Sequence, residues 1–173
     1  MLNRYKLNCV GQGFETRQLK ADAAKSEIIY VGDAVAMETD GYVIKLRGHA
    51  TALLASAGYG VVAAIKDTNS AASREDVLPT NLPAAHAGDL SVIIDPEATF
   101  ALEFKNSGSV TQAYVGASFN LATTGNQQID NDTISATDDR QFTCIGIFTD
   151  ALSSLVYGVL RWKKHAFKRT ASI

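Results

Sequence analysis

Three histidines and a group of aspartates are the residues of this 173-residue chain whose types suit metal chemistry. The histidines are His49, His86 and His165, and the aspartates are Asp130, Asp132, Asp138 and Asp139. The histidines lie far apart and lack the ligand spacing of a zinc site. The aspartates would offer calcium the oxygen ligands it prefers, but the glycine and closing glutamate of an EF-hand loop are missing. We therefore expect no metal site, and interpret the acidic stretch as a solvated loop.

Sequence motifs for catalysis are also missing. Gly11-Gln-Gly13 and Gly58-Tyr-Gly60 do not continue to a third glycine, nor do they join a strand to a long helix, so neither predicts a dinucleotide loop. The chain has no P-loop, no Gly-x-Ser-x-Gly elbow and no His-Glu-x-x-His motif. Nothing in the sequence places a base beside a nucleophile. We expect no enzymatic activity and no cofactor.

The composition predicts one core of ordinary polarity. Hydrophobic residues make up 46% of the chain, charged residues 20%, and the net charge is −2, which favours a single domain without a basic excess for nucleic acid. No apolar run is long enough for a bilayer, and the first six residues predict no secretory signal. Cys9 and Cys144 are expected to be free thiols, a disulfide between them being the alternative.

The clearest secondary-structure pattern surrounds the dipeptide Asp95-Pro96. Both residue types favour a turn, aspartate by bonding its own backbone and proline by its fixed φ. Residues 98–105 then alternate, with Ala98, Phe100, Leu102 and Phe104 on one side, as in a half-buried strand. Residues 90–94 form a short β-branched run before the turn. We predict that these two strands are the central unit of a β fold.

Further strands are expected along the chain, joined by turns and two long polar loops. The strands are predicted over residues 28–31, 34–37, 42–46, 59–65, 110–119, 142–149 and 155–162. Thr39-Asp-Gly41 predicts a hairpin turn, and residues 49–57 a short helix. Residues 66–89 are too long for an ordinary connection and suggest a functional or partner-contacting loop. A second loop over residues 120–139 is expected to contain a short strand near Ile134.

This pattern predicts an all-β fold, a sandwich or barrel of about eight short antiparallel strands with long loops and little helix. Residues 1–27 are interpreted as an N-terminal arm or edge segment. Residues 28–173 are interpreted as a single β-rich domain with a basic C-terminal tail.

The basic tail is the strongest candidate for a contact surface, since its cations alternate with aromatic residues. Such interleaving can bind nucleic acid, but the rest of the chain is slightly acidic. Two alternatives are that Trp162 closes the core, and that the tail docks on an acidic protein partner. The N-terminal arm could serve the same purpose. The partner-binding residues predicted on this basis are Arg4, Tyr5, Lys6, Arg161, Trp162, Lys163, Lys164 and Phe167.

Several short motifs occur in an order seen in one group of viral proteins. They are a Gly-Asp-x-Val element within residues 29–37, the hairpin at Asp40-Gly41, a Gly-Val strand at residues 60–65, the segment from Asp95-Pro96 to Phe104, and residues 115–120. In this order, over roughly residues 28 to 162, the chain resembles the capsid decoration, or cement, proteins of tailed bacteriophages.

The resemblance implies a virion structural protein with no catalytic residues, no cofactor and no metal. Such proteins are made in the host cytoplasm, lie on the outer capsid surface, and bridge subunits of the major capsid protein. The expected partners are therefore the major capsid protein and further copies of this chain, a trimer being favoured over a dimer, with no nucleic acid and no membrane. Repetition over a closed shell would multiply a modest contact, and residues 1–27 and 66–89 are hypothesised to add buried surface.

Other classes remain open from the sequence. A carbohydrate-binding β-sandwich would need exposed aromatic residues on a flat face. The candidates are Tyr42, Tyr59, Tyr114, Tyr157 and Trp162, although most fall inside strand patterns typical of a core. An enzyme is a third alternative. Another phage structural role, in the tail or neck, would share the fold class.

Overall fold

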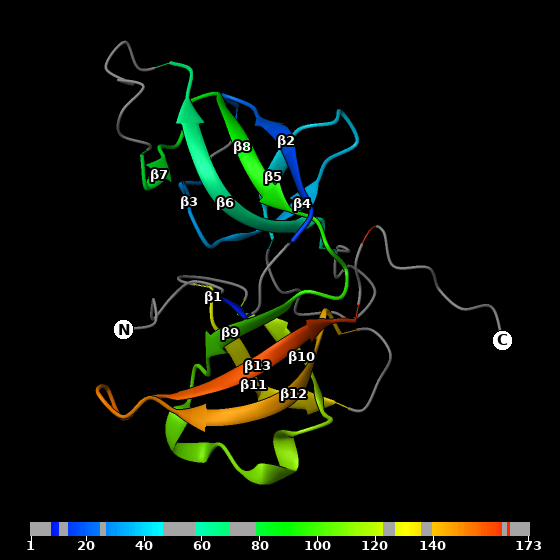
Figure 1. Ribbon diagram of the computed structural model, residues 1–173, viewed down its shortest axis with the longest axis vertical. Helices are drawn as coiled ribbons and strands as arrows, with labels where there is room; N and C mark the ends of the chain where they lie inside the picture. Colours follow the sequence, from blue (N-terminus) through cyan, green and yellow to red (C-terminus); the bar gives the residue numbers. More distant parts are fainter. Residues whose placement is uncertain are drawn as a thin grey trace, which may run out of the picture.

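The computed structural model describes residues 8–10, 14–24, 27–46, 58–69, 79–122, 127–135, 140–163 and 166. Within these residues the strands are β1 Asn8–Val10, β2 Thr16–Ala21, β3 Ile29–Tyr30, β4 Ala34–Met37, β5 Val43–Lys45, β6 Gly60–Asp67, β7 Asn81–Leu82, β8 Gly88–Ile93, β9 Thr99–Glu103, β10 Ser118–Leu121, β11 Ile129–Ser135, β12 Phe142–Thr149 and β13 Val156–Trp162. Two short 3-10 helices, η2 Ser107–Ser109 and η3 Gln112–Tyr114, interrupt them. The predicted all-β class is confirmed (Figure 1). The expected number of about eight strands was too low. Several of the observed strands have only two or three residues and therefore show no alternation in the sequence.

The strands form two main sheets, which Figure 1 shows one above the other. The lower, six-stranded sheet has the order β1-β9-β13-β12-β10-β11, with antiparallel neighbours. It curls until β9 meets β11, where Phe104 bridges Ile129 and the amide of Lys105 donates to the Ile129 carbonyl at 3.0 Å. The lower unit is therefore barrel-like, with β1 added along its seam.

The upper unit is a five-stranded antiparallel sheet with the order β2-β8-β6-β4-β5. Its outer strands β2 and β5 also approach each other. A two-stranded sheet of β3 and β7 lies beside it. Both β1 and β2, from the segment predicted as an arm or edge, occupy the ends of their sheets.

Two apolar clusters fill the molecule, and β4 contributes to both. The upper cluster comprises Ala21, Ile29, Val35, Val43, Val62, Ile65, Leu82, Leu90, Val92 and Ile94. The other cluster fills the lower unit with Phe100, Phe119, Phe142, Trp162 and their neighbours, and it extends to Ala34 and Ala36 of β4. Because alternate residues of a strand face opposite sides, β4 is buried on both faces. The two units therefore share one continuous apolar seam.

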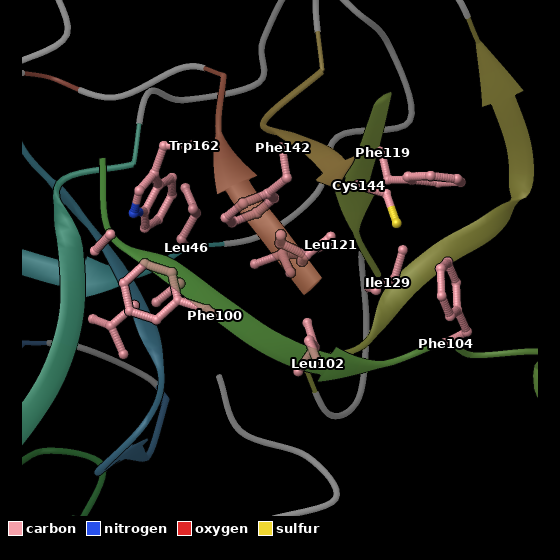
Figure 2. Packing of buried hydrophobic residues seen from close by; sticks show 14 of the residues in the cluster. Leu46, Phe100, Leu102, Phe104, Phe119, Leu121, Ile129, Phe142, Cys144 and Trp162 are labelled. Carbon is pink, nitrogen blue, oxygen red and sulfur yellow. The ribbon is translucent and has the colours of Figure 1, made fainter. Parts of the chain in front are cut away.

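Aromatic rings line that seam. Trp162 lies 4.5 Å from Phe142 and 6.0 Å from Phe100 between ring centroids, and both pairs are within the range of favourable aromatic contacts. Figure 2 shows these rings gathered beside Leu46, which follows β5 in the upper unit. The C-terminal end of β13 thus closes the core against the other sheet.

The Asp95-Pro96 turn links the two sheets. The amide of Glu97 donates to Asp95 Oδ1 at 2.9 Å, and the amide of Ala98 to the Asp95 carbonyl at 3.2 Å, as expected for a turn that aspartate stabilises. Before it, β8 lies between β2 and β6, and after it β9 lies between β1 and β13. Both predicted strands and the turn between them are confirmed, but the two strands belong to different sheets and do not pair as one central unit.

Most other predicted elements are confirmed. The hairpin of β4 and β5 turns at Gly41, whose φ is +89°, and Asp40 Oδ1 accepts from the amide of Tyr42 at 3.1 Å. Strands β6, β12 and β13 match their predicted positions, and β11 contains Ile134. The loop predicted over residues 66–89 is shorter at both ends, because β6 continues to Asp67 and β8 begins at Gly88, and it contains the two-residue strand β7. The helix predicted at residues 49–57 lies outside the described residues.

The strand predicted over residues 110–119 is wrong in its first part. Residues 112–114 form η3, and strand β10 begins only at Ser118. The amide of Tyr114 donates to the Thr111 carbonyl at 3.0 Å, and the Tyr114 ring packs 5.7 Å from Phe104 and 5.5 Å from Phe119. Burial of this ring against the core outweighed the β propensity of the segment.

The substitution Gly60→Ala tests the close approach of β6 and β8. A Cβ at Gly60 would lie 2.1 Å from the backbone oxygen of Ile93, so Gly60→Ala requires a strand to move. We expect a loss of about 1–3 kcal/mol in the free energy of unfolding, measured by urea denaturation. Gly146→Ala is the matched control, because its Cβ would meet Val159 at an ordinary 3.7 Å. Equal effects of the two variants would contradict this packing.

Candidate functional site

Gln127 is a buried polar residue that joins the two units. Its side chain is fully buried. Gln127 Oε1 accepts from the amide of Ala34 at 2.7 Å, while Nε2 donates to the carbonyls of Ala34 at 3.0 Å and Leu46 at 2.8 Å. An amide side chain has one acceptor and two donors of this kind. Gln127, placed just before β11 of the lower unit, therefore fixes β4 and the end of β5 of the upper unit.

A second glutamine fastens strands within the lower unit. Gln141 Oε1 accepts from the backbone amide of Leu121 at 3.0 Å, and the backbone amide of Gln141 donates to Asn120 Oδ1 at 3.0 Å. Both residues are buried. Buried polar groups that are hydrogen-bonded in this way specify one arrangement of the chain. These amides therefore position strands.

Two pairs of ionisable side chains lie within hydrogen-bonding distance in the described part of the upper unit. Lys45 Nζ lies 3.0 Å from Asp33 Oδ2, both side chains being nearly inaccessible, and 5.4 Å above the ring centre of Tyr30. His86 Nδ1 lies 2.8 Å from Asp67 Oδ2, and Asp67 Oδ1 also accepts from the amide of Asn69. Asp67 is in β6, whereas His86 precedes β8, so this pair closes the base of the predicted long loop.

Asp130 and Asp132 of the acidic stretch lie in strand β11, so the loop predicted for them is wrong, and Asp132 belongs to a polar cluster at the end of β9. Asp132 accepts from Lys105 Nζ at 2.6 Å and from the side-chain amide of Asn106. The hydrogen bond to Asp132 and its charge raise the pKa of Lys105. Asp138 and Asp139 lie outside the described residues, as do His49 and His165. Among the residues that are described, no three histidine, cysteine, aspartate or glutamate side chains group as a metal site.

The turn between β12 and β13 presents an exposed leucine. Asp150 organises it: the carboxylate accepts from Ser153 Oγ at 2.6 Å, and the backbone carbonyl from the amide of Ser154 at 2.8 Å. The Ser153 bond lowers the pKa of Asp150. Leu152 at the tip is 76% exposed, and Figure 1 shows the hairpin projecting from the lower unit. A fixed turn thus holds a large apolar side chain in solvent.

The structure separates the predicted partner-binding residues. Trp162 is 1% exposed, so its prediction as a partner anchor is corrected: the indole closes the core, the alternative that the sequence left open. Arg161 is exposed, and Lys163 Nζ donates to Ser118 Oγ at 3.1 Å. The remaining predicted residues, Arg4, Tyr5, Lys6, Lys164 and Phe167, lie outside the described residues.

The aromatic residues considered for carbohydrate binding are mostly internal. Tyr114, Tyr157 and Trp162 are buried, with exposed fractions of 7%, 1% and 1%. Tyr42 and Tyr59 are half-buried, and Tyr59 packs on the upper core. A flat sugar-binding platform needs exposed aromatic rings, and these five residues together do not form such a platform.

Cys144 is a free thiol in the lower core. Burial raises the pKa of this thiol, whose Sγ donates to the Gly146 carbonyl. A buried thiol of raised pKa is a poor nucleophile. The prediction of a free thiol is confirmed for Cys144, and the side chain of Cys9 lies outside the described residues.

Sequence reasoning missed Gln127 and Leu152. No local pattern distinguishes Gln127 from the polar residues around it, because its partners lie 81 and 93 positions away in the chain. Leu152 had a signal: it is an apolar residue in the short connection between two predicted strands, flanked by Asp150 and Ser153. Because this turn lies outside both predicted strands, an apolar side chain there is not explained by the alternation that buries a strand face.

No family model, curated protein or solved structure matches this chain. In the part of the chain that the structure describes, no helix is long and apolar enough to cross a membrane.

Gln127→Ala tests the connection between the units. The substitution leaves the amide of Ala34 and the carbonyl of Leu46 buried without the glutamine, and we expect a loss of about 2–5 kcal/mol in the free energy of unfolding. Chemical denaturation would measure it. Gln128→Ala is the control, since Gln128 is half-buried and binds Ala122 only through its backbone carbonyl. If both variants were as stable as the parent, Gln127 would not join the units.

Proposed function

We propose that this chain is a virion structural protein, a capsid decoration (cement) protein that bridges major capsid protein subunits on the outer surface of a phage head. The order of short motifs from residue 29 to residue 120 supports this proposal. So does the all-β fold, whose sheets share a core. The proposed partners are the major capsid protein and other copies of this chain.

The observation that carries the proposal is the hairpin of β12 and β13. Most buried polar groups described above hold strands together, whereas Leu152 is held outward by the Asp150 turn. The hairpin stands on a stiff base, because Phe148 and Tyr157 stack across it with ring centres 5.5 Å apart. A preformed apolar tip binds with little ordering cost and can act as an anchor in a partner's pocket.

A cement protein also has to transmit force without changing shape. The shared apolar seam and the three hydrogen bonds of Gln127 join the two units, so that load applied to one reaches the other. Close-packed interiors deform little. Many copies on a closed shell would then multiply a modest contact for each copy.

Leu152→Ser tests the hairpin as the shell contact. Burying a leucine contributes about 1.5–3 kcal/mol, so we expect roughly ten- to hundredfold weaker binding, at about 1.4 kcal/mol per factor of ten. The measurement is occupancy of purified shells that lack this protein, by co-sedimentation over a concentration series. Thermal stability should not change, because Leu152 is already exposed.

Ala151→Ser is the matched control on the same exposed turn and should bind like the parent. Unchanged occupancy for Leu152→Ser would exclude the hairpin contact. If the parent chain failed to bind the shells at all, the proposed function itself would be wrong.

A further inference from the structure

In the lower unit, the edge of β9 that does not pair with β13 is covered partly by Ile129 and partly by the short strand β1. Ile129 pairs with the residues just after β9: it forms a β-bridge with Phe104, and its carbonyl accepts from the amide of Lys105. The start of the edge pairs with β1, where Asn8, Cys9 and Val10 lie opposite Ala101, Phe100 and Thr99. The strand β1 therefore fills the part of the seam that β11 does not reach.

This part of β9 needs a partner strand. Of the three residues that pair with β1, Phe100 and Ala101 are each at most 2% exposed and Thr99 is half-buried, and unpaired backbone groups beside a buried core are costly. An open edge is also a template for any strand that fits it. The β9 edge is thus an acceptor site whose complementary segment is residues 8–10.

Among the described residues, the pairing of β1 is shorter than that of the next strand. Three residues of β1 pair with β9, whereas β2 pairs with β8 over six residues, and the carbonyl of Glu15 extends that ladder by accepting from the amide of Ile94. Release of β1 would therefore leave β2 and the upper unit in place. Five residues separate the two strands, so β1 could reach an acceptor within roughly 20 Å of Thr16.

From these observations we propose that β1 is exchangeable between copies, and that the β9 edge accepts Asn8–Val10 of a second copy of this chain. A second copy offers the same residues in the same register, so the exchanged pairing replaces the internal one without loss. The result is a chain-to-chain link that buries no new surface. This inference goes beyond the proposed function and does not require a shell.

Concentration decides which pairing forms. A short connection gives internal pairing an effective concentration on the order of 1 mM. Exchange should therefore be rare at micromolar concentrations and reach about half of the chains near millimolar. Copies crowded side by side on a surface would have a local concentration near millimolar, at which exchange is expected.

Two single-cysteine variants in a Cys9→Ser background test the exchange. Val10→Cys and Thr99→Cys place the thiols on directly opposite residues of β1 and β9, where Cβ atoms are close enough for a disulfide. One variant carries a size tag, and the two are mixed, incubated and oxidised. Only exchange between copies can join them, so we expect a mixed disulfide on a non-reducing gel that rises at least a hundredfold from micromolar to millimolar protein.

The double variant Val10→Cys/Thr99→Cys at micromolar concentration should form an internal disulfide, which confirms the register and the fold. Val10→Cys mixed with Ser91→Cys is the mismatch control, since Ser91 lies in β8 of the other sheet. No mixed disulfide at any concentration, or as much with Ser91→Cys as with Thr99→Cys, would overturn the proposal. So would failure of the internal disulfide to form. None of these results bears on binding to shells.

Discussion

The structure depends on burying both faces of β4. Ala34 and Ala36 pack on the aromatic core of the lower unit, while Val35 packs within the upper one. A strand buried on two sides must have its backbone satisfied by protein, and Gln127 of the lower unit supplies two of those bonds, to the amide and the carbonyl of Ala34, with a third to the carbonyl of Leu46 after β5. Small side chains at Ala34 and Ala36 allow this approach. Apolar packing therefore brings the sheets together, and hydrogen bonds from Gln127 and from the amide of Ala166 to the Gly58 carbonyl connect them.

The same constraint explains how the surface and the interior differ in role. Buried polar groups such as Gln127, Gln141 and Asn120 position strands, and the buried Lys45–Asp33 pair lies inside the upper unit. The Leu152 hairpin, in contrast, carries apolar surface outward on a fixed turn. A protein organised in this way suits recognition by shape, which is what the proposed role on a capsid requires.

The sequence predicted the elements whose signals are local. Alternation identified β9, and the Asp-Gly and Asp-Pro dipeptides marked two turns, because these residues fix backbone conformation by themselves. It did not predict η3, since the burial of Tyr114 depends on Phe104 and Phe119. Nor did it assign β8 and β9 to different sheets or find the partners of Gln127, which lie more than 80 residues away. From the sequence, Trp162 could either close the core or anchor a partner, and only its contacts with Phe100 and Phe142 decide for the core.

The central claim is that the two sheets form one structural unit across the β4 seam. Differential scanning calorimetry tests it most directly, through the ratio of the calorimetric to the van't Hoff enthalpy of unfolding. A shared core predicts a single transition with a ratio of about one. Two separable transitions, one for each sheet, would contradict it.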